Sequence, residues 1–275
     1  MNKQLLIIGK PHSSKTVFLS QFYSRLQKKK SKLSLYKAVV DLSPISGARE
    51  ALANGDEPEA TNTLKSEYFY LPIQTSDGMK IDLQCPEYGG EQVDGIIDNR
   101  ELDKNWSEAI NTSDNWIFFI RLNSVNHSTN ISSIEITKDN PPNLGNDISN
   151  EYRLSDQSSL IELLQLILHY KGFNYHLKNQ KVKLTIVLTC WDELKTNEKP
   201  KSILESRLPL LLNFIESNWD RQFVKYIGLS ALGFPLNYPE NKEKYQIEGP
   251  ESFGYLVNDD GQKTNDITEL IIEAL

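Results

Sequence analysis

Residues 5–16 read LLIIGKPHSSKT. The first four are apolar and form a run of the length expected for a buried strand, which Gly9 closes. From residue 14 to residue 28, apolar side chains recur at helical spacing. A buried strand followed at once by an amphipathic helix indicates the beginning of an α/β fold.

The loop between this strand and helix is the first candidate site. A phosphate cradle needs backbone N–H groups at a helix N-terminus, a lysine for the β and γ phosphates and a hydroxyl ligand for Mg2+. Gly9, Lys15 and Thr16 have the spacing G-x-x-x-x-G-K-[ST], with Ser14 in place of the second glycine. An ordinary strand-to-helix turn capped by Ser13 or Ser14 is equally compatible with this motif alone.

The rest of the chain continues the alternation of strands and helices. We expect a short strand over 36–41 and a helix over 48–53, and the pair Asp77-Gly78 predicts a hairpin between strands 67–74 and 79–85. Later elements are predicted from apolar runs: strands over 116–122, 182–188 and 223–229, and helices over 160–170, 202–219 and 266–275. The pattern predicts an α/β fold with a mostly parallel sheet, one antiparallel hairpin strand and helices on both faces.

Two polar stretches interrupt this pattern. Residues 123–155 are rich in Asn, Ser, Asp and Pro, and residues 233–263 are rich in Pro and Gly. Residues 123–155 have too few apolar side chains for a core of their own. We therefore predict one domain over 1–275 with an insertion at 123–155 and a long irregular loop at 233–263, and we expect the apolar C-terminal helix to dock on that same domain.

Composition excludes several classes of protein. The 275 residues are 39% hydrophobic and 24% charged, enough to bury a core. The net charge of −7 gives no general attraction for nucleic acid or anionic lipid, so we expect neither as a direct partner. No run approaches the roughly 20 apolar residues of a membrane span. With only two cysteines, we expect a reduced cytoplasmic protein.

Three further stretches follow directly on predicted strands. They are Glu87-Tyr88-Gly89-Gly90, Thr189-Cys190-Trp191-Asp192 and Ser230-Ala231. In open α/β sheets, ligands bind at the carboxyl ends of the strands. We therefore expect these stretches to share one edge of the sheet with the loop 9–16.

In this order, the four stretches resemble the motifs of the P-loop GTPase superfamily, whose Ras-like G domain is a three-layer α/β fold. Residues 9–16 resemble its phosphate loop, 87–90 its D-x-x-G switch, 189–192 its [NT]-K-x-D guanine-reading motif, and Ser230-Ala231 its S-A loop. More narrowly, the chain is similar to the bacterial double-GTPase family of predicted conflict and anti-phage systems. The residues that carry this narrower resemblance lie in 52–61, 90–91, 189–194 and 249–255.

The resemblance implies a role for each matching residue. Asp192 would accept hydrogen bonds from guanine N1–H and the exocyclic amine, and Ser230 and Ala231 would close over the base carbonyl. Expected nucleotide-binding residues are Gly9, Ser13, Ser14, Lys15, Thr16, Thr189, Asp192, Ser230 and Ala231. Expected Mg2+ ligands are Thr16, Thr61 and Glu87, and the expected catalytic residues are Lys15, Thr61, Glu87 and Gly90.

Several positions depart from the family pattern. Ser14 replaces a glycine, Cys190 a lysine and Glu87 an aspartate, and Glu91 stands where Ras-like proteins have a water-positioning glutamine. Catalysis of phosphoryl transfer depends on positioning and charge neutralisation, so each misplaced group matters. We predict a switch that binds GTP or GDP with Mg2+ and hydrolyses GTP slowly or with a stimulating partner. A protein effector or companion GTPase-family protein is the expected partner.

Two other functions remain open at this stage. A pseudo-GTPase would keep the fold as an interaction module and bind nucleotide weakly or not at all. A P-loop ATPase or nucleotide kinase would prefer ATP. For single residues, we expect Trp191 to pack beside the base pocket and Arg121 to pair with the switch rather than act as an arginine finger.

Overall fold

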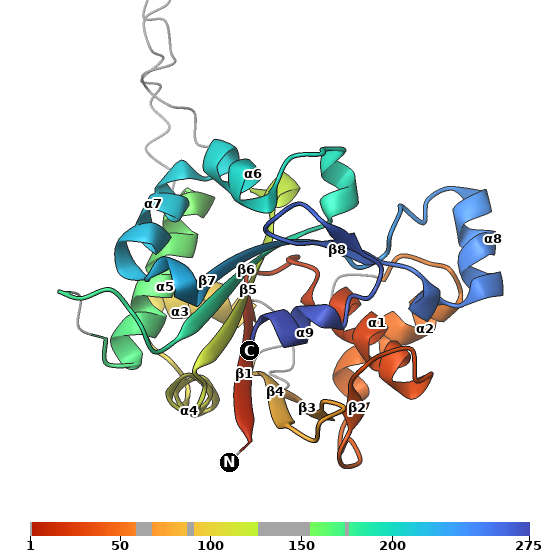
Figure 1. The fold of residues 1–275 in the computed structure, drawn as a ribbon, viewed down its shortest axis with the longest axis horizontal. Helices are drawn as coiled ribbons and strands as arrows, with labels where there is room; N and C mark the ends of the chain where they lie inside the picture. Colours follow the sequence, from red (N-terminus) through yellow and green to blue (C-terminus); the bar gives the residue numbers. More distant parts are fainter. Residues whose placement is uncertain (1, 59–67, 87–90, 126–154, 174–175) are drawn as a thin grey trace, which may run out of the picture.

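The computed structural model describes residues 2–58, 68–86, 91–125, 155–173 and 176–275. Within these ranges a nine-stranded sheet has the order β2-β3-β4-β1-β5-β6-β7-β8-β9 (Figure 1). The strands are β1 (Lys3–Gly9), β2 (Ser34–Leu35), β3 (Phe69–Gln74), β4 (Lys80–Cys85), β5 (Asn115–Arg121), β6 (Lys183–Thr189), β7 (Val224–Ser230), β8 (Tyr255–Val257) and β9 (Lys263–Thr264). The α-helices are α1 (Lys15–Gln27), α2 (Ser43–Ala53), α3 (Glu91–Asn99), α4 (Lys104–Thr112), α5 (Asp156–Tyr170), α6 (Pro200–Arg207), α7 (Pro209–Asn218), α8 (Pro239–Glu248) and α9 (Glu269–Glu273).

The centre of the sheet is parallel and its edges are antiparallel. Strands β4, β1, β5, β6 and β7 pair in parallel, whereas β2-β3-β4 and β7-β8-β9 pair antiparallel. The predicted α/β fold class is confirmed. The antiparallel part extends beyond the one hairpin strand expected, because each edge of the parallel centre is continued by short strands.

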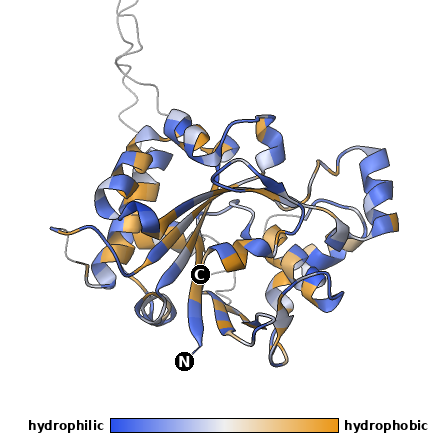
Figure 2. Cartoon of the chain, viewed as in Figure 1, coloured by the Kyte–Doolittle hydropathy of each residue, from blue (hydrophilic) through white to orange (hydrophobic). Residues whose placement is uncertain are grey.

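Helices cover both faces of the sheet and bury two apolar cores. One core contains side chains of α3, α4, α5, α6 and α7. It also contains the residues of β1, β5 and β6 that face these helices. The other lies under α1 and α9 and includes the alternate residues of the same strands. Figure 1 shows these helices on opposite sides of the sheet, and Figure 2 shows hydrophobic residues gathered between the layers. Ile267, Leu270 and Ile271 are fully buried in the second core, as the prediction that the C-terminal helix docks on the same domain requires.

Most predicted elements are confirmed to within a few residues. The first strand and helix correspond to β1 and α1, and the Asp77-Gly78 hairpin joins β3 to β4 with Gly78 at φ +85°. The predicted strands at 116–122, 182–188 and 223–229 correspond to β5, β6 and β7. Helix α2 starts five residues before the predicted helix, because Ser43–Ala53 includes a proline in its first turn.

The strand predicted over 36–41 is wrong. Strand β2 covers only Ser34–Leu35, which pair with Gln74 and Ile73 of β3. The next residue, Tyr36, donates its N–H to Pro72 O at 3.1 Å, but Pro72 has no N–H to return. The antiparallel ladder therefore ends opposite this proline.

The single helix predicted over 202–219 is also wrong. The segment forms two helices, α6 and α7, that meet at Leu208. Pro209 disfavours helical angles in the preceding residue, and Leu208 has φ −134° and ψ 60°. Proline is instead well placed as the first residue of α7.

Strand β7 is not the last strand, contrary to the prediction, and the stretch 233–263 is not irregular. It contains α8 and β8, and Lys263 begins β9. Residues 228–230 of β7 pair with residues 255–257 of β8 and so cover the edge of the parallel sheet.

Helices α3 and α4, which precede β5, were not predicted. The C-terminal helix α9 is shorter than predicted. None of the helices in the described ranges is both long and apolar enough to cross a bilayer.

Candidate functional site

The register of the parallel strands brings three of the four predicted motifs to one edge of the sheet; the fourth, 87–90, lies outside the described residues. Gly9 at the end of β1 is paired with Phe119 of β5, and Arg121 of β5 with Thr189 of β6. Thr189 in turn is paired with Leu229, one residue before Ser230. The phosphate-loop motif, the Thr189–Asp192 stretch and the Ser230-Ala231 stretch therefore start from neighbouring strand ends.

The loop from Gly9 to Thr16 wraps around the ammonium group of Lys15. Lys15 begins α1 and is 6% exposed. Its Nζ donates to Gly9 O at 2.5 Å, to Lys10 O at 2.9 Å and to Ser13 Oγ at 3.4 Å. A positive charge is thus held in the loop, at the N-terminus of a helix that has no acidic residue in its first turn. Both features favour an anion at this position.

Ser14 occupies a backbone conformation that usually requires glycine. Its φ is +65° and its ψ is 19°, in the left-handed region. A side chain in this region costs on the order of 1 kcal/mol. The loop therefore keeps the backbone geometry that explains the usual glycine of the motif, in spite of the substitution.

The loop after β6 contacts the phosphate-loop motif directly. Ser14 Oγ and Cys190 Sγ are 3.1 Å apart. Asp192 is two residues after Cys190, and Lys15 directly follows Ser14. Because consecutive Cα atoms are about 3.8 Å apart, the Cα of Asp192 is at most about 7.6 Å from that of Cys190. The predicted phosphate-binding and base-reading residues thus converge.

Cys190 is a neutral thiol in this setting. Burial raises the pKa of Cys190 to about 11, although the hydroxyl of Ser14 and the charge of Arg121 lower it. Next to it, Thr189 is 1% exposed, and its Oγ1 has no hydrogen-bond partner among the residues described. Buried polar atoms are nearly always paired, so an orphan hydroxyl here is consistent with a site completed by a ligand.

Arg121 is occupied by a neighbouring carboxylate. Its Nη2 donates to Glu193 Oε1 at 2.5 Å, and Asn123 Nδ2 donates to Glu193 Oε2 at 3.1 Å. The sequence suggested a pairing with the switch at 87–90, but those residues lie outside the described ranges. In the described part of the chain the partner is Glu193, in the 3-10 turn Trp191–Leu194. This ion pair fixes the turn that carries Asp192.

Trp191 holds the same turn against the sheet. It is 3% exposed and packs in the core formed with α5, α6 and α7. Its ring lies over Gly228 of β7, so close that a Cβ on Gly228 would be 2.4 Å from Trp191 Cδ2. Trp191 therefore packs as predicted, and Gly228 is what allows it to do so.

Replacing Gly228 with alanine is expected to displace Trp191. We expect the free energy of unfolding to fall by about 2 kcal/mol, as for other overpacked cores, and the affinity for nucleotide to fall about tenfold. Urea unfolding and calorimetry would measure these effects. Gly47→Ala is the matched control, because nothing lies within 4 Å of a Cβ there and alanine favours the surrounding helix. A Gly228→Ala variant with unchanged stability and affinity would contradict the prediction.

The loop after β7 is held rigidly. Ser230 is fully buried, and its Oγ accepts the N–H of Gly233 at 2.9 Å. A Cβ on Gly254 would be 2.6 Å from Ala231 O and 3.1 Å from Ser230 O. Gly254 has φ +96°, so glycine is required for two reasons. This close approach explains one glycine of the 249–255 motif.

Lys10 links the same loop to two helices. Its Nζ is 3.4 Å from Asp94 Oδ1 of α3 and 3.5 Å from Asp156 Oδ1 of α5. This cluster surrounds a small hollow of about 190 Å3 beside His12 and Arg121. Sequence reasoning missed the cluster, because its members are too far apart in the chain for any spacing signal.

The remaining predicted residues are Thr16, Thr61, Glu87 and Gly90. Thr16 is the second residue of α1, directly after Lys15. Thr61, Glu87 and Gly90 lie outside the described residues, so their roles stay predictions.

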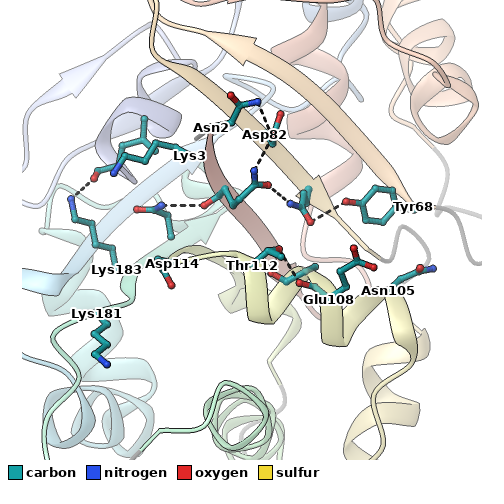
Figure 3. Close-up of a pocket in the computed structure, with 15 residues that line it drawn as sticks. Asn2, Lys3, Tyr68, Asp82, Asn105, Glu108, Thr112, Asp114, Lys181 and Lys183 are labelled. Carbon is teal, nitrogen blue, oxygen red and sulfur yellow. Dashed lines mark hydrogen bonds between the residues drawn. The ribbon is translucent and has the colours of Figure 1, made fainter.

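A large hollow lies at the opposite end of the sheet. It measures about 1040 Å3 and lies at the amino ends of β1, β5 and β6 (Figure 3). Asp82 accepts hydrogen bonds there from Tyr36 and Tyr70 at 2.5 Å, from Gln4 at 2.8 Å and from Asn2 at 3.1 Å. Its carboxylate is already fully bonded within the protein, and the hollow is distant from the phosphate-loop motif. We therefore exclude it as the predicted nucleotide site.

Replacing Asp82 with asparagine is expected to lower the free energy of unfolding by about 2 kcal/mol, because an amide group would face the donors that now bond the carboxylate. Burial alone would raise the pKa of Asp82, but these hydrogen bonds outweigh it and the pKa is lowered. The stabilisation of the folded protein by the ionised Asp82 carboxylate is thus complete above its ordinary pKa of about 4. It is lost as the pH falls through the lower pKa that Asp82 has in the folded protein. Urea unfolding between pH 2.5 and pH 6 should show this loss in the wild type and not in Asp82→Asn. Glu108→Gln is the control, since Glu108 is exposed in the same hollow; an equal effect there would contradict the prediction.

Comparison with known families decides the identity of this fold. Residues 6–274 match the family described as Double-GTPase 1. The chain belongs to this family. It is therefore a GTPase-like domain, and membership of the family implies binding of GTP or GDP. No curated protein sequence matches the chain.

Several solved structures resemble the fold of this double-GTPase at low sequence identity. The bacterial selenocysteine-specific elongation factor EF-Sec is 16% identical over 90% of this chain and 29% of its own, with a TM-score of 0.40. The Arl6 BBS3 small GTPase from Trypanosoma brucei, with a bound nucleotide analogue GppNp, is 10% identical over 91% of this chain and 98% of its own, with a TM-score of 0.42. The S. cerevisiae Ski7 GTPase-like domain bound to GTP is 15% identical over 87% of this chain and 46% of its own, with a TM-score of 0.46. The chain thus spans less than half of the elongation factor and of the Ski7 chain.

Proposed function

We propose that this protein is a guanine-nucleotide switch that binds GTP or GDP with Mg2+ at the carboxyl edge of its sheet. The contact between Ser14 Oγ and Cys190 Sγ carries the proposal. It joins the loop that has the chemistry for phosphates to the loop that has a carboxylate for guanine. One nucleotide can therefore reach both.

Lys15 and the N-terminus of α1 would hold the phosphates. The ammonium of Lys15 now bonds Gly9 O and Lys10 O, so it is already inside the loop. In the complex it would exchange these oxygens for those of the β and γ phosphates, while loop N–H groups bond the β phosphate. Thr16 would supply the hydroxyl ligand for Mg2+, which neutralises phosphate charge. Thr61 and Glu87 complete the proposed metal site.

Asp192 would select guanine. Its carboxylate can accept the N1–H and the exocyclic amine of guanine, and it would repel the lone pair of adenine N1. Ser230 and Ala231 start from the adjacent strand end and would close over the base carbonyl. Thr189, whose buried hydroxyl is unpartnered among the described residues, is paired with Leu229, the residue before Ser230.

Slow or partner-stimulated hydrolysis is the second part of the proposal. Arg121 is held by Glu193, so it does not lie free to act as an arginine finger. Ser14, Glu87 and Cys190 depart from the residues that the superfamily uses. A protein that supplies the missing charge would therefore accelerate hydrolysis.

The proposal extends to the setting of this switch. The family resemblance favours a cytoplasmic protein with a companion GTPase-family protein or effector, in a bacterial conflict or anti-phage system. The insertion 123–155 and the exposed side of the segment 233–263, which carries α8 and β8, are the proposed partner surfaces, because segments added to a rigid scaffold often carry recognition.

Calorimetry of the full chain with GTP, GDP and ATP tests the proposal. We expect micromolar affinity for GTP and GDP that is lost when Mg2+ is removed, and no comparable binding of ATP. Hydrolysis without a partner should be on the order of 10^-3 per second or slower. If neither guanine nucleotide produced heat, the chain would be a pseudo-GTPase that acts as an interaction module.

A further inference from the structure

Helix α8 contributes a buried tyrosine to the edge of the sheet where the predicted site lies. Tyr245 is fully buried, stacks on Phe253 with ring centres 4.8 Å apart and meets Phe234 edge-on at 5.8 Å. Leu52 of α2 belongs to the same small core. Figure 1 shows α8 beside α2, far from the centre of the sheet. This small core anchors the tyrosine side chain.

The hydroxyl of Tyr245 is part of a buried hydrogen-bond network with Gln21 of α1. Gln21 Nε2 donates to Tyr245 Oη at 2.5 Å and to Ala231 O at 3.2 Å. Tyr245 Oη donates to Leu232 O at 3.3 Å. Gln21 is fully buried as well, and its Oε1 has no partner in the described part of the chain. Among the described residues, the side chain of Gln21 is thus bonded through its amino group alone.

These bonds fix the backbone that follows Ser230. A peptide unit is planar, and its C=O and N–H point in opposite directions. The Leu232–Gly233 unit is held at its carbonyl by Tyr245 and at its N–H by Ser230 Oγ. The Ala231–Leu232 unit is held at its carbonyl by Gln21. Both peptide planes are therefore set by side chains rather than by sheet pairing.

The same tyrosine lies near the carboxylate proposed to read guanine. Burial raises the pKa of Tyr245, and the charge of Asp192 adds to this effect. Burial also raises the pKa of Tyr255 of β8, again with a contribution from Asp192. The network therefore bonds the backbone next to Ala231 and lies within the electrostatic influence of Asp192.

We infer that Gln21 and Tyr245 are positioning residues for guanine selectivity: they hold the Ala231–Gly233 backbone in the orientation in which the N–H of Leu232, on the opposite side of its peptide unit from the carbonyl that Gln21 bonds, meets the base carbonyl. The inference rests on the proposed function and adds to it a pair of residues on α1 and α8. Adenine carries an amino group in place of the carbonyl, so a correctly oriented N–H favours guanine and disfavours adenine.

Tyr245→Phe is the first test variant, because it removes only the hydroxyl. Calorimetry of the full chain with Mg2+ would compare GDP, IDP and ADP. IDP retains the base carbonyl but lacks the exocyclic amine. We expect GDP and IDP to bind about threefold to tenfold more weakly to Tyr245→Phe, by the same factor, because one hydrogen bond to their common carbonyl is misaligned. The affinity for ADP should not fall, so the preference for guanine over adenine narrows.

Two further variants separate positioning from a general structural role. Tyr238→Phe is the control, since Tyr238 precedes α8 and is 54% exposed; it should bind all three nucleotides as the wild type does. Gln21→Met removes the donor from the other side of the network and serves equally if Tyr245→Phe does not fold. The double variant should lose less selectivity than the sum of the single losses, because the two residues bond each other and hold adjacent peptide units.

The outcomes distinguish this inference from the proposed function. Wild-type protein that prefers GDP, with an unchanged GDP-to-ADP ratio in a folded Tyr245→Phe or Gln21→Met variant, overturns the inference and leaves the proposed function intact. An equal loss of GDP and ADP binding also overturns it, since that pattern indicates general loosening. Wild-type protein that binds no guanine nucleotide overturns both.

Discussion

Replacing Lys15 with alanine is expected to weaken binding of Mg2+-GTP by at least about a hundredfold, or about 3 kcal/mol. Lys15 is nearly fully buried, and its ammonium is aimed into the loop by three oxygen acceptors. A phosphate bound there would interact with a charge screened from water, where the attraction is strong. Calorimetry with GTP and GDP measures the loss.

Lys10→Ala is the matched control for this variant. Lys10 lies in the same loop, but its ammonium pairs with Asp94 and Asp156. Because that pairing turns its charge toward α3 and α5, we expect GTP affinity to change by less than about threefold, the scale of a partly exposed ion pair. Equal losses in Lys10→Ala and Lys15→Ala would show that only the overall charge of the loop matters. Unchanged binding in Lys15→Ala would contradict the assignment of the phosphate site.

Replacing Asp192 with alanine is expected to abolish the preference for guanine over adenine. A carboxylate that accepts two hydrogen bonds from guanine contributes about 2 to 3 kcal/mol, so GDP affinity should fall roughly thirtyfold to a hundredfold. The same variant should also bind GDP and IDP equally, because the exocyclic amine that distinguishes them loses its acceptor. Competition binding with GDP, IDP and ADP measures both effects.

Glu193→Gln is the control for Asp192→Ala. It changes the neighbouring carboxylate in the same turn, which bonds Arg121 and Asn123. We expect the turn to loosen slightly and the guanine preference to remain. A preference for ATP that survives Asp192→Ala would instead support a P-loop ATPase or nucleotide kinase.

Local sequence was a reliable guide where one short segment carries its own signal. The run Leu5–Ile8, the Asp77-Gly78 turn and the apolar face of α1 each gave the correct element. Prediction from local sequence failed where a residue far away in the chain determines where a strand begins or ends. Strand β2 ends because Pro72, opposite Tyr36, has no N–H to donate. Strand β8 forms by pairing its backbone with the edge of β7.

Some residues of the candidate site could likewise be predicted from local sequence, and others could not. The spacing of Gly9, Lys15 and Thr16 and the order of the later motifs predicted which stretches to examine. No spacing could reveal the buried pair Gln21 and Tyr245, because one lies on a helix predicted only from its apolar spacing and the other in a stretch predicted to be irregular. The same holds for Gly228, whose importance comes only from the ring of Trp191 above it.

By itself, the sequence determined the alternation of strands and helices and the strand–loop–helix that carries the phosphate-loop motif, because hydrophobic periodicity and turn chemistry act over a few neighbouring residues. Only the tertiary structure decided that Ser14 meets Cys190, that Glu193 pairs with Arg121, and that α8 reaches back to the loop after β7. These contacts depend on the register of strands far apart in the chain and on the packing of helices across the sheet. Their geometry is set when the whole core closes, so no local pattern of residues contains it.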